Sequence, residues 1–254
     1  MKIHDTIPFQ AMLAFVLPFL VMMVLPTGVT CFHQLLASVS QSPKIINPKL
    51  PIHFQMKWRI IASTNNNDSI PLYWNPLPPN GVKYMIGTGS TYYNFDHKAM
   101  LEVYDDFCVP IFGPLEDKLN RFRCHFLNVN LASYLISLDE SPFPPCCVFG
   151  AQVFHPPEPD FLKHMVYNSS GEIMGEPVNW WVLDSDPNDP AEPFGYGFYK
   201  KSSSYGEIPA AFWFRTVNGF SIQYFYKFEE KNPDPDVWRL PSICVNAPSC
   251  GYLN

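Results

Sequence analysis

The chain has 254 residues and a formal net charge of -6, and 47% of its residues are hydrophobic, 16% aromatic and 16% charged. The charged fraction lies below the roughly 25% of an average globular protein, which excludes a disordered chain. An acidic chain without a basic stripe also argues against nucleic acid or an anionic membrane surface as a partner. The length suits one domain with a full hydrophobic core.

Residues 1–31 predict a cleaved secretory signal peptide. Lys2 and His4 precede an apolar run from Ala11 to Leu25, which the short, turn-forming "TGVT" follows after a proline. The run is shorter than the roughly 18 residues expected of a membrane span, although a retained N-terminal anchor is the alternative. We therefore expect residues 32–254 to form a single secreted β-rich domain, located outside the cell or in a lumenal, vacuolar or lysosomal compartment.

Period-two alternation of apolar and polar residues predicts β-structure from residue 52 onward. The segment "IHFQMKWRII" places Phe54, Trp58 and Ile60 on one face and Lys57 with Arg59 on the other. Further strands are predicted at residues 92–104, 122–129, 133–138, 146–154, 178–184 and 194–200. Short strands separated by Pro, Gly, Asn and Asp clusters predict a largely antiparallel sheet.

Two N-x-[ST] motifs predict N-linked glycosylation of a secreted chain. Asn67 lies in the polar segment "STNNNDS", and Asn168 lies in "YNSSGE", which we interpret as a turn.

Cysteine count and spacing predict disulfides rather than a metal or redox site. The chain has seven cysteines, and removal of a signal that ends at Cys31 leaves six: Cys108, Cys124, Cys146, Cys147, Cys244 and Cys250. Six cysteines allow about 15 pairings, among which the sequence does not choose. Neighbouring strand residues point to opposite faces, so Cys146 and Cys147 should each bond a different distant partner. Neither zinc-ligand spacing nor a C-x-x-C motif is present, and we predict no metal site and no cofactor.

Helices are predicted to be few and short. The best candidates are "PPEPDFLKHM" at residues 156–165 and "GPLEDKLNRF" at residues 113–122. The acidic segment at residues 183–195 resembles calcium loops in its oxygen-bearing side chains, but it lacks their glycine and glutamate positions. A solvated loop is the preferred interpretation, and calcium is not an expected partner.

The segment "AAFWFRTVNGFSIQYFYKF" predicts a hairpin. A turn at Asn218-Gly219 would pair Trp213 with Tyr224 on one face and Phe212 with Phe225 on the other. Both faces then carry large aromatics. The sheet is therefore packed on both sides, or packed on one side and lined by an apolar cavity on the other.

No esterase elbow, zinc-protease motif or phosphate loop is present. Glu102 with Asp105 or Asp106 could serve a glycosidase as paired carboxylates if their separation were suitable. A secreted enzyme acting on carbohydrate therefore remains one alternative function. An extracellular structural or adhesive protein without a pocket is another.

The order "CC", "PPEPDFL", "YNSSGEIMG", "VNWWVLD", "GYGFYK", an aromatic hairpin and "WRLPSIC" resembles secreted ependymin-related proteins and a group of similar secreted plant proteins. The pattern covers roughly residues 82–244, and these proteins resemble the LolA-type half-barrel in fold. The resemblance implies an α+β fold, predominantly antiparallel β, in which a strongly curved, disulfide-stapled sheet and one or two short helices enclose a lipid or fatty acid.

From these observations we predict a secreted, non-catalytic binding protein for a small hydrophobic ligand, with a homodimer left open. The candidate lining residues are large aromatics that combine apolar area with a polar edge: Trp58, Trp180, Trp181, Tyr199, Trp213 and Tyr224. Trp180 and Trp181 cannot both face one cavity if their strand is regular.

Overall fold

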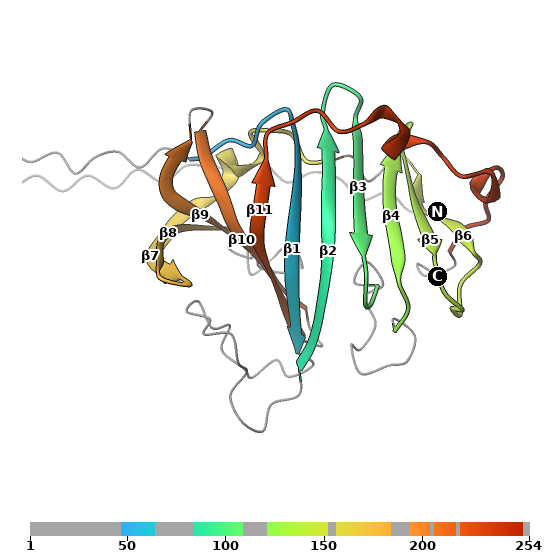
Figure 1. Cartoon of the computed structure of the whole chain (residues 1–254), viewed down its shortest axis with the longest axis horizontal. Helices are drawn as coiled ribbons and strands as arrows, with labels where there is room; N and C mark the ends of the chain where they lie inside the picture. Colours follow the sequence, from blue (N-terminus) through green and yellow to red (C-terminus); the bar gives the residue numbers. More distant parts are fainter. Residues whose placement is uncertain are drawn as a thin grey trace, which may run out of the picture. The chain divides into compact units, whose positions relative to one another are not determined.

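Eleven strands form one antiparallel sheet in the order β6-β5-β4-β3-β2-β1-β11-β10-β9-β8-β7 (Figure 1). The strands are β1 (His53–Ser63), β2 (Tyr84–Asn94), β3 (Ala99–Tyr104), β4 (Cys124–Val129), β5 (Ala132–Ser137), β6 (Cys146–Ala151), β7 (Val166–Ile173), β8 (Glu176–Leu183), β9 (Phe194–Ser203), β10 (Gly206–Thr216) and β11 (Gly219–Glu229). Among the residues that the structure describes, three short 3-10 helices accompany them: η2 (Phe161–His164), η3 (Pro235–Trp238) and η4 (Ser242–Cys244). The predicted fold class, an antiparallel curved sheet with disulfides, is confirmed.

This computed structural model describes residues 47–63, 84–108, 121–151, 156–183, 194–203, 206–216 and 219–250. The predictions for the signal peptide, Cys31, Asn67, most of the 113–122 helix and the acidic loop at 184–193 lie outside the described residues. Within the described part, no helix has the length and apolar character needed to cross a membrane.

The chain builds the sheet as two meanders that meet at its centre. Strands β1 to β6 follow one another to one edge, and β7 to β11 return from the opposite edge until β11 pairs with β1. The connection from β6 to β7 carries η2, whose Leu162 is fully buried. Carbonyl groups of this connection accept hydrogen bonds from Tyr93 and Asn47, so it is tied to β2 and to the segment before β1.

We define the two faces of the sheet by the tryptophans of β8. The inner face contains Trp181 with Phe54, Trp58, Tyr93 and Phe198. The outer face contains Trp180, which packs with Ile61, Ala211, Ile222 and Tyr224. Near β6 the outer face also carries Leu101, Leu127 and Ile136. Both faces bury aromatic and aliphatic side chains, which explains why the sequence shows apolar residues on both sides of most strands.

The sheet curls around its inner face. Trp181 of β8 packs in the same cluster as Phe54 of β1, several strands away in the sheet order. Met100 of β3 and Tyr196 of β9 also pack against that cluster. In a flat sheet five strand spacings would separate β3 from β9 by about 24 Å, far beyond side-chain contact. Curvature therefore brings the two halves of the inner face together.

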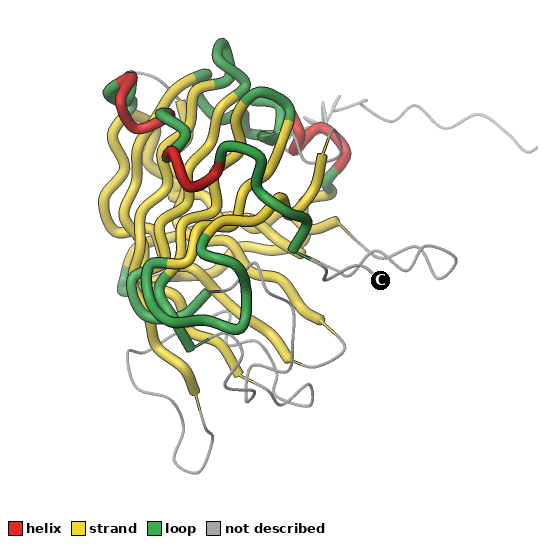
Figure 2. Tube along the Cα trace, turned by 90° about the vertical axis from the view of Figure 1, so that its right-hand side faces the viewer, coloured by secondary structure: helices red, strands yellow, loops and turns green. Residues whose placement is uncertain are grey.

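The C-terminal segment after β11 covers the outer face of strands β3 to β6. Val237, Trp238 and Leu240 pack against the cluster that contains Leu101 and Leu127. The helical turns thus lie on both faces of the sheet, η2 on the inner face and η3 with η4 on the outer face (Figure 2).

Adjacent cysteines in β6 fasten this C-terminal segment from both sides. Cys146 bonds Cys244 in the outer cluster, and Cys147 bonds Cys250 beside the inner cluster. Between the two bonds, the Val148 amide donates to the Pro248 carbonyl at 2.7 Å, and the Cys250 amide donates to the Val148 carbonyl at 3.0 Å. The third disulfide joins Cys108 to Cys124. The prediction that the adjacent cysteines bond different distant partners is confirmed.

The register of the β10–β11 hairpin differs from the prediction. Trp213 pairs with Ile222 rather than Tyr224, and Phe212 pairs with Gln223 rather than Phe225. Thr216 pairs with Gly219, so residues 217–218 make the connection and Gly219 begins β11. The shift is two residues, which leaves every side chain on its predicted face. β11 also pairs with β1, so its register depends on that second pairing as well as on the turn. The turn sequence alone carries no information about the second pairing.

Two segments were assigned wrongly from the sequence. The "YNSSGEI" segment is not a turn: it forms most of the edge strand β7, in which Asn168 is exposed. Residues 92–104 are not one strand, because the chain turns between Asn94 and Ala99, where Lys98 adopts a φ of 48°. Polar side chains are tolerated in β7 because it has a neighbour on one side only.

Candidate functional site

The six predicted lining residues do not lie on one surface. Trp58 and Trp181 belong to the inner face, whereas the outer face holds Trp180, Tyr199, Trp213 and Tyr224. A single ligand site therefore cannot contact all six side chains. The two halves of the Trp180-Trp181 pair face opposite ways, as the alternation of a regular strand requires.

Three of the tryptophans pack against glycines of a neighbouring strand. Trp58 lies opposite Gly89, Trp180 opposite Gly197 and Trp213 opposite Gly195 in the strand register. A Cβ atom at Gly195 would lie 2.3 Å from the Trp213 indole nitrogen, and one at Gly197 would lie 2.9 Å from the Trp180 ring. Each indole thus covers the backbone of a glycine in the neighbouring strand.

The inner face carries a buried polar group at its centre. The Tyr104 hydroxyl donates a hydrogen bond of 3.0 Å to the Glu102 carboxylate, and both residues belong to β3. Thr91 of β2 lies opposite Glu102 and accepts a hydrogen bond of 3.0 Å from the Trp58 indole. On the other side, Phe126 of β4 lies opposite Glu102.

Residues from the far half of the sheet reach this centre. The side chain of Gln223, from β11, hydrogen-bonds to Tyr104, and Tyr196 of β9 lies within electrostatic reach of both Tyr104 and Glu102. Burial raises the pKa of Glu102 to about 6, an effect that the Tyr104 hydrogen bond partly opposes. Burial and then the Glu102 charge raise the pKa of Tyr104 and of Tyr196, so both phenols stay protonated at neutral pH.

Apolar side chains that are only partly buried pack against the two inner-face clusters. They come from strands on both halves of the sheet and from the connections: Met56, Met85, Met100, Phe143, Phe149, Phe194, Tyr196, Phe212 and Phe214. Side chains that filled a closed core would be inaccessible to solvent, as Trp58 is. The inner face therefore offers accessible aromatic and thioether surface beside a half-buried carboxyl group.

Several buried polar atoms near this surface lack a hydrogen-bond partner. Within the described part of the chain these include the indole nitrogen of Trp181 and the hydroxyl of Ser221, both on the inner face. Ser221 is 1% exposed and lies two residues from Gln223 along β11. Buried polar atoms usually have a partner, so these groups are available to a bound molecule or to water.

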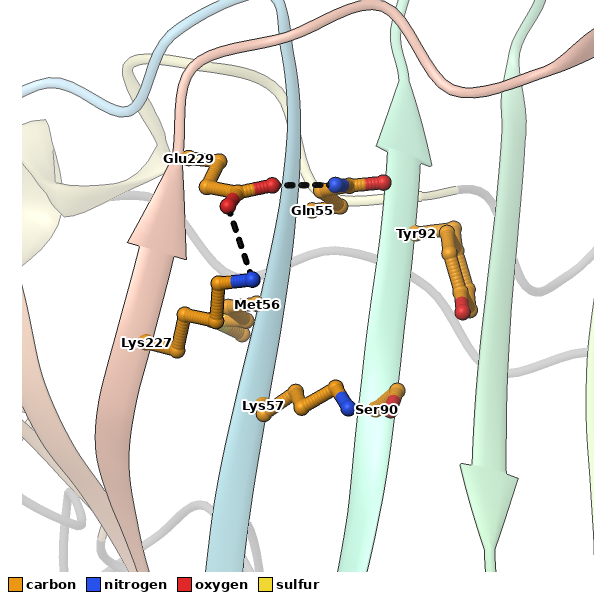
Figure 3. Close-up of a pocket in the computed structure, with 7 residues that line it drawn as sticks. All are labelled: Gln55, Met56, Lys57, Ser90, Tyr92, Lys227 and Glu229. Carbon is orange, nitrogen blue, oxygen red and sulfur yellow. Dashed lines mark hydrogen bonds and ion pairs between the residues drawn. The ribbon is translucent and has the colours of Figure 1, made fainter.

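The outer face has a shallow polar depression across β11, β1 and β2 (Figure 3). Its acidic residue, Glu229, accepts hydrogen bonds from Gln55 and from Lys227, the latter at 2.9 Å. These contacts lower the pKa of Glu229. Lys57 and Lys227 are exposed, and Glu229 is already bound by Gln55 and Lys227, so the depression resembles an ordinary solvated sheet surface.

The carboxylates considered for a glycosidase have different surroundings. Glu102 is half buried and bonded to Tyr104, whereas Asp106 is exposed and accepts hydrogen bonds from the amide and hydroxyl of Thr88. Asp105 is also exposed. Among the described residues, no group of three or more His, Cys, Asp or Glu side chains is placed to bind a metal ion.

Comparison with known proteins gives similarity in structure alone. No protein-family model and no curated protein matches the chain. An uncharacterized conserved protein from Thermus thermophilus is similar in structure, with 8% identity over 76% of this chain and 89% of that chain and a TM-score of 0.39. The LolA superfamily protein NE2245 from Nitrosomonas europaea has 8% identity over 76% of this chain and 92% of that chain, with a TM-score of 0.33.

The second neighbour carries the LolA name that the sequence resemblance predicted. The resemblance to ependymin-related proteins stays a prediction. At these TM-scores and identities neither likeness bears on ligand or activity, and the assignment of function rests on the residues of this chain.

Proposed function

We propose that the protein is a secreted, non-catalytic binding protein that holds an apolar, lipid-like ligand on the inner face of its curved sheet. The supporting observation is the set of partly exposed aromatic and methionine side chains on the inner face, which come from strands far apart in the sheet order and include Phe212 of β10 and Met100 of β3. Ligand sites are commonly concave and apolar with a few placed polar groups, and Glu102 with Tyr104 are groups of that kind.

Location outside the reducing cytosol is part of this proposal. Three disulfides are present among the described residues, and disulfides persist in oxidising compartments. The apolar run near the N-terminus supplies the matching export signal in the sequence.

Two neighbouring residues of β10 provide a matched test of which face binds. Phe212 lies on the inner face and Trp213 on the outer face, and both are partly buried aromatics. We expect Phe212→Ala to weaken binding of a fluorescent fatty-alcohol probe roughly tenfold, because the lost apolar contact would cost about 1.4 kcal/mol of binding free energy. Trp213→Ala should leave the affinity within about twofold, provided that both variants remain folded by circular dichroism.

The ligand itself is sought by native mass spectrometry of protein secreted from a eukaryotic host, followed by organic extraction. A co-purifying apolar molecule near one per chain supports the proposal. An empty protein that takes up no apolar probe would overturn the proposal in favour of an enzyme or a structural protein. A probe affinity that falls with Trp213→Ala and not with Phe212→Ala would overturn the inner face as the binding surface.

A further inference from the structure

Glu102 is an unusual group for a surface that binds an ordinary lipid. It lies half buried on an apolar face, and its hydrogen-bond partner is the Tyr104 hydroxyl. An ionised carboxylate removed from water is costly unless a cation or several donors compensate its charge. One phenol supplies a single donor, which leaves most of the acceptor capacity of the carboxylate unused.

The described part of the protein does not supply a cation for this carboxylate. Every lysine and arginine whose side chain is described is exposed to solvent, from Lys49 to Arg239. The nearest histidine along the sheet, His125, pairs with Val103 and therefore points to the outer face. The compensating charge is thus missing from the described residues around Glu102.

The groups around Glu102 favour a ligand that donates hydrogen bonds over a ligand that accepts them. The neighbouring Tyr104 and Thr91 oxygens already receive hydrogen bonds from Gln223 and Trp58 and keep acceptor capacity. A primary ammonium has three donors, no acceptor and a positive charge, which complements this set. A fatty-acid carboxylate accepts only, and it would meet the Glu102 charge at short range.

We propose that the ligand is a single-chain amphiphile with a protonated primary amine, whose ammonium group binds Glu102 while its apolar chain lies against the inner-face aromatics. This inference rests on the proposed function and narrows its ligand class from any lipid-like molecule to a cationic one.

The pairing has a built-in dependence on pH. Glu102 faces Thr91 from β2, Phe126 from β4, Tyr196 from β9 and Tyr104 from its own strand, and both tyrosines remain neutral. Protonation of Glu102 is therefore the change that removes negative charge from this cluster as the pH falls, and burial brings its pKa to about 6. Affinity for the amine should fall in that range, while affinity for an uncharged analogue should not.

The test compares dodecylamine, dodecanol and dodecanoate as competitors of a neutral fluorescent alkane-chain probe on the full-length protein. At about pH 7.5 the amine is fully protonated, and we expect it to displace the probe at roughly tenfold lower concentration than the alcohol, with the acid weakest. Glu102→Gln should abolish the preference of the protein for the amine over the alcohol. In the unaltered protein, lowering the pH to about 5 should erase the same preference, which provides a test that does not depend on the variant's folding.

The outcomes separate this inference from the proposed function. Equal displacement by amine and alcohol, or a preference for the amine that survives both Glu102→Gln and acid, would overturn the cationic ligand and leave a neutral lipid carrier. Failure of the alcohol, the amine and the probe alike to bind would overturn the proposed function and this inference together.

Discussion

At the scale of single residues, close contacts between glycine and tryptophan decide how the strands fit together. The "GTG" of β2 and the "GYG" of β9 each place two glycines on one face, and three of these four are covered by an indole of a neighbouring strand. The same "GTGS" segment has no phosphate-binding context in the sequence, and the structure shows it inside a strand. Its glycines serve packing, because they allow a large ring to lie against the backbone.

Gly89 gives the sharpest test of this packing. A Cβ at this position would lie 2.1 Å from the Val103 carbonyl oxygen and 2.2 Å from the Trp58 ring. Since one neighbour is backbone, Gly89→Ala should destabilise the protein by about 1 to 3 kcal/mol in urea denaturation. Ser90→Ala, one residue away on the outer face, is the control and should change stability by no more than about 0.5 kcal/mol. A Gly89→Ala variant as stable as the parent would mean that β2 and β3 can move apart without lowering the free energy of unfolding.

Glu102 also predicts a pH-dependent stability difference. Its pKa is raised from 4.5 to about 6 in the folded protein, so the folded state binds the proton more tightly than the unfolded chain does. Proton binding to Glu102 therefore adds about 2 kcal/mol to the free energy of unfolding below the unfolded pKa, and this contribution is lost as the pH rises through about 6.

Glu102→Gln removes that titration. In ligand-free protein the variant should match the parent below about pH 4.5 and exceed its stability by about 2 kcal/mol above about pH 7. Denaturation curves of both proteins across this range supply the measurement, and the parent serves as its own reference for other titrating groups. A difference that is constant with pH would contradict burial of an ionisable Glu102.

At the scale of elements, the C-terminal segment is held to β6 by the two disulfides of Cys146 and Cys147, which close separations of 98 and 103 residues. Without them this segment would rest on the apolar contacts of Val237, Trp238 and Leu240 and on the backbone hydrogen bonds of Val148 with Pro248 and Cys250. Cross-links that close long loops remove more entropy from the unfolded chain than those that close short ones.

Removing one of these bonds should lower stability, and removing both should lower it further. Replacing Cys147 and Cys250 by serine should lower stability by about 2 to 5 kcal/mol and reduce the amount of protein secreted. The matched variant also replaces Cys146 and Cys244 and should be less stable still, because the Cys146–Cys244 bond alone keeps nearly the same loop closed. Equal thermal stability of the parent and the Cys147–Cys250 variant would contradict a stabilising role for this bond.

Predictions for the elements succeeded where the pattern is local and failed where it is shared between strands. The alternation of Phe54, Trp58 and Ile60 against Lys57 and Arg59 is visible in one segment, and β1 follows it. The hairpin register was missed because it depends on two further strand pairings, and β7 was missed because an edge strand can be polar. The site centre at Glu102 was noticed only as part of a carboxylate pair. Both faces of the sheet are apolar, and the sequence does not show which of them lies inside the curve. It therefore does not show that Glu102 points inward.

At the scale of the whole molecule, the two edges of the sheet are protected differently. The β6 edge is covered in part by the C-terminal segment through the Val148–Ser249 bridge. The β7 edge has exposed Val166, Tyr167 and Asn168. An exposed edge strand is a template for pairing with a second chain, unless something bulky prevents it.

A glycan at Asn168 would be such an obstacle. We expect protein from a eukaryotic host to carry one sugar chain that Asn168→Gln removes, as seen by intact mass. The unglycosylated variant should form dimers more readily in analytical ultracentrifugation, whereas Asn67→Gln should not. Unchanged self-association after loss of the Asn168 sugar would show that β7 is not a pairing edge.

The arrangement of the disulfides turns much of the chain into a closed covalent ring. The ring runs from Cys147 through β7 to β11 and back along the C-terminal segment to Cys250, while Cys146 and Cys244 close a second ring inside nearly the same span. A protease that cuts a peptide bond between Cys147 and Cys244 would therefore produce two pieces that remain one molecule, because both disulfides still join them. Such nicking would be invisible on a non-reducing gel and appear only after reduction. A protein built this way can lose the continuity of its backbone and still keep β1 beside β11.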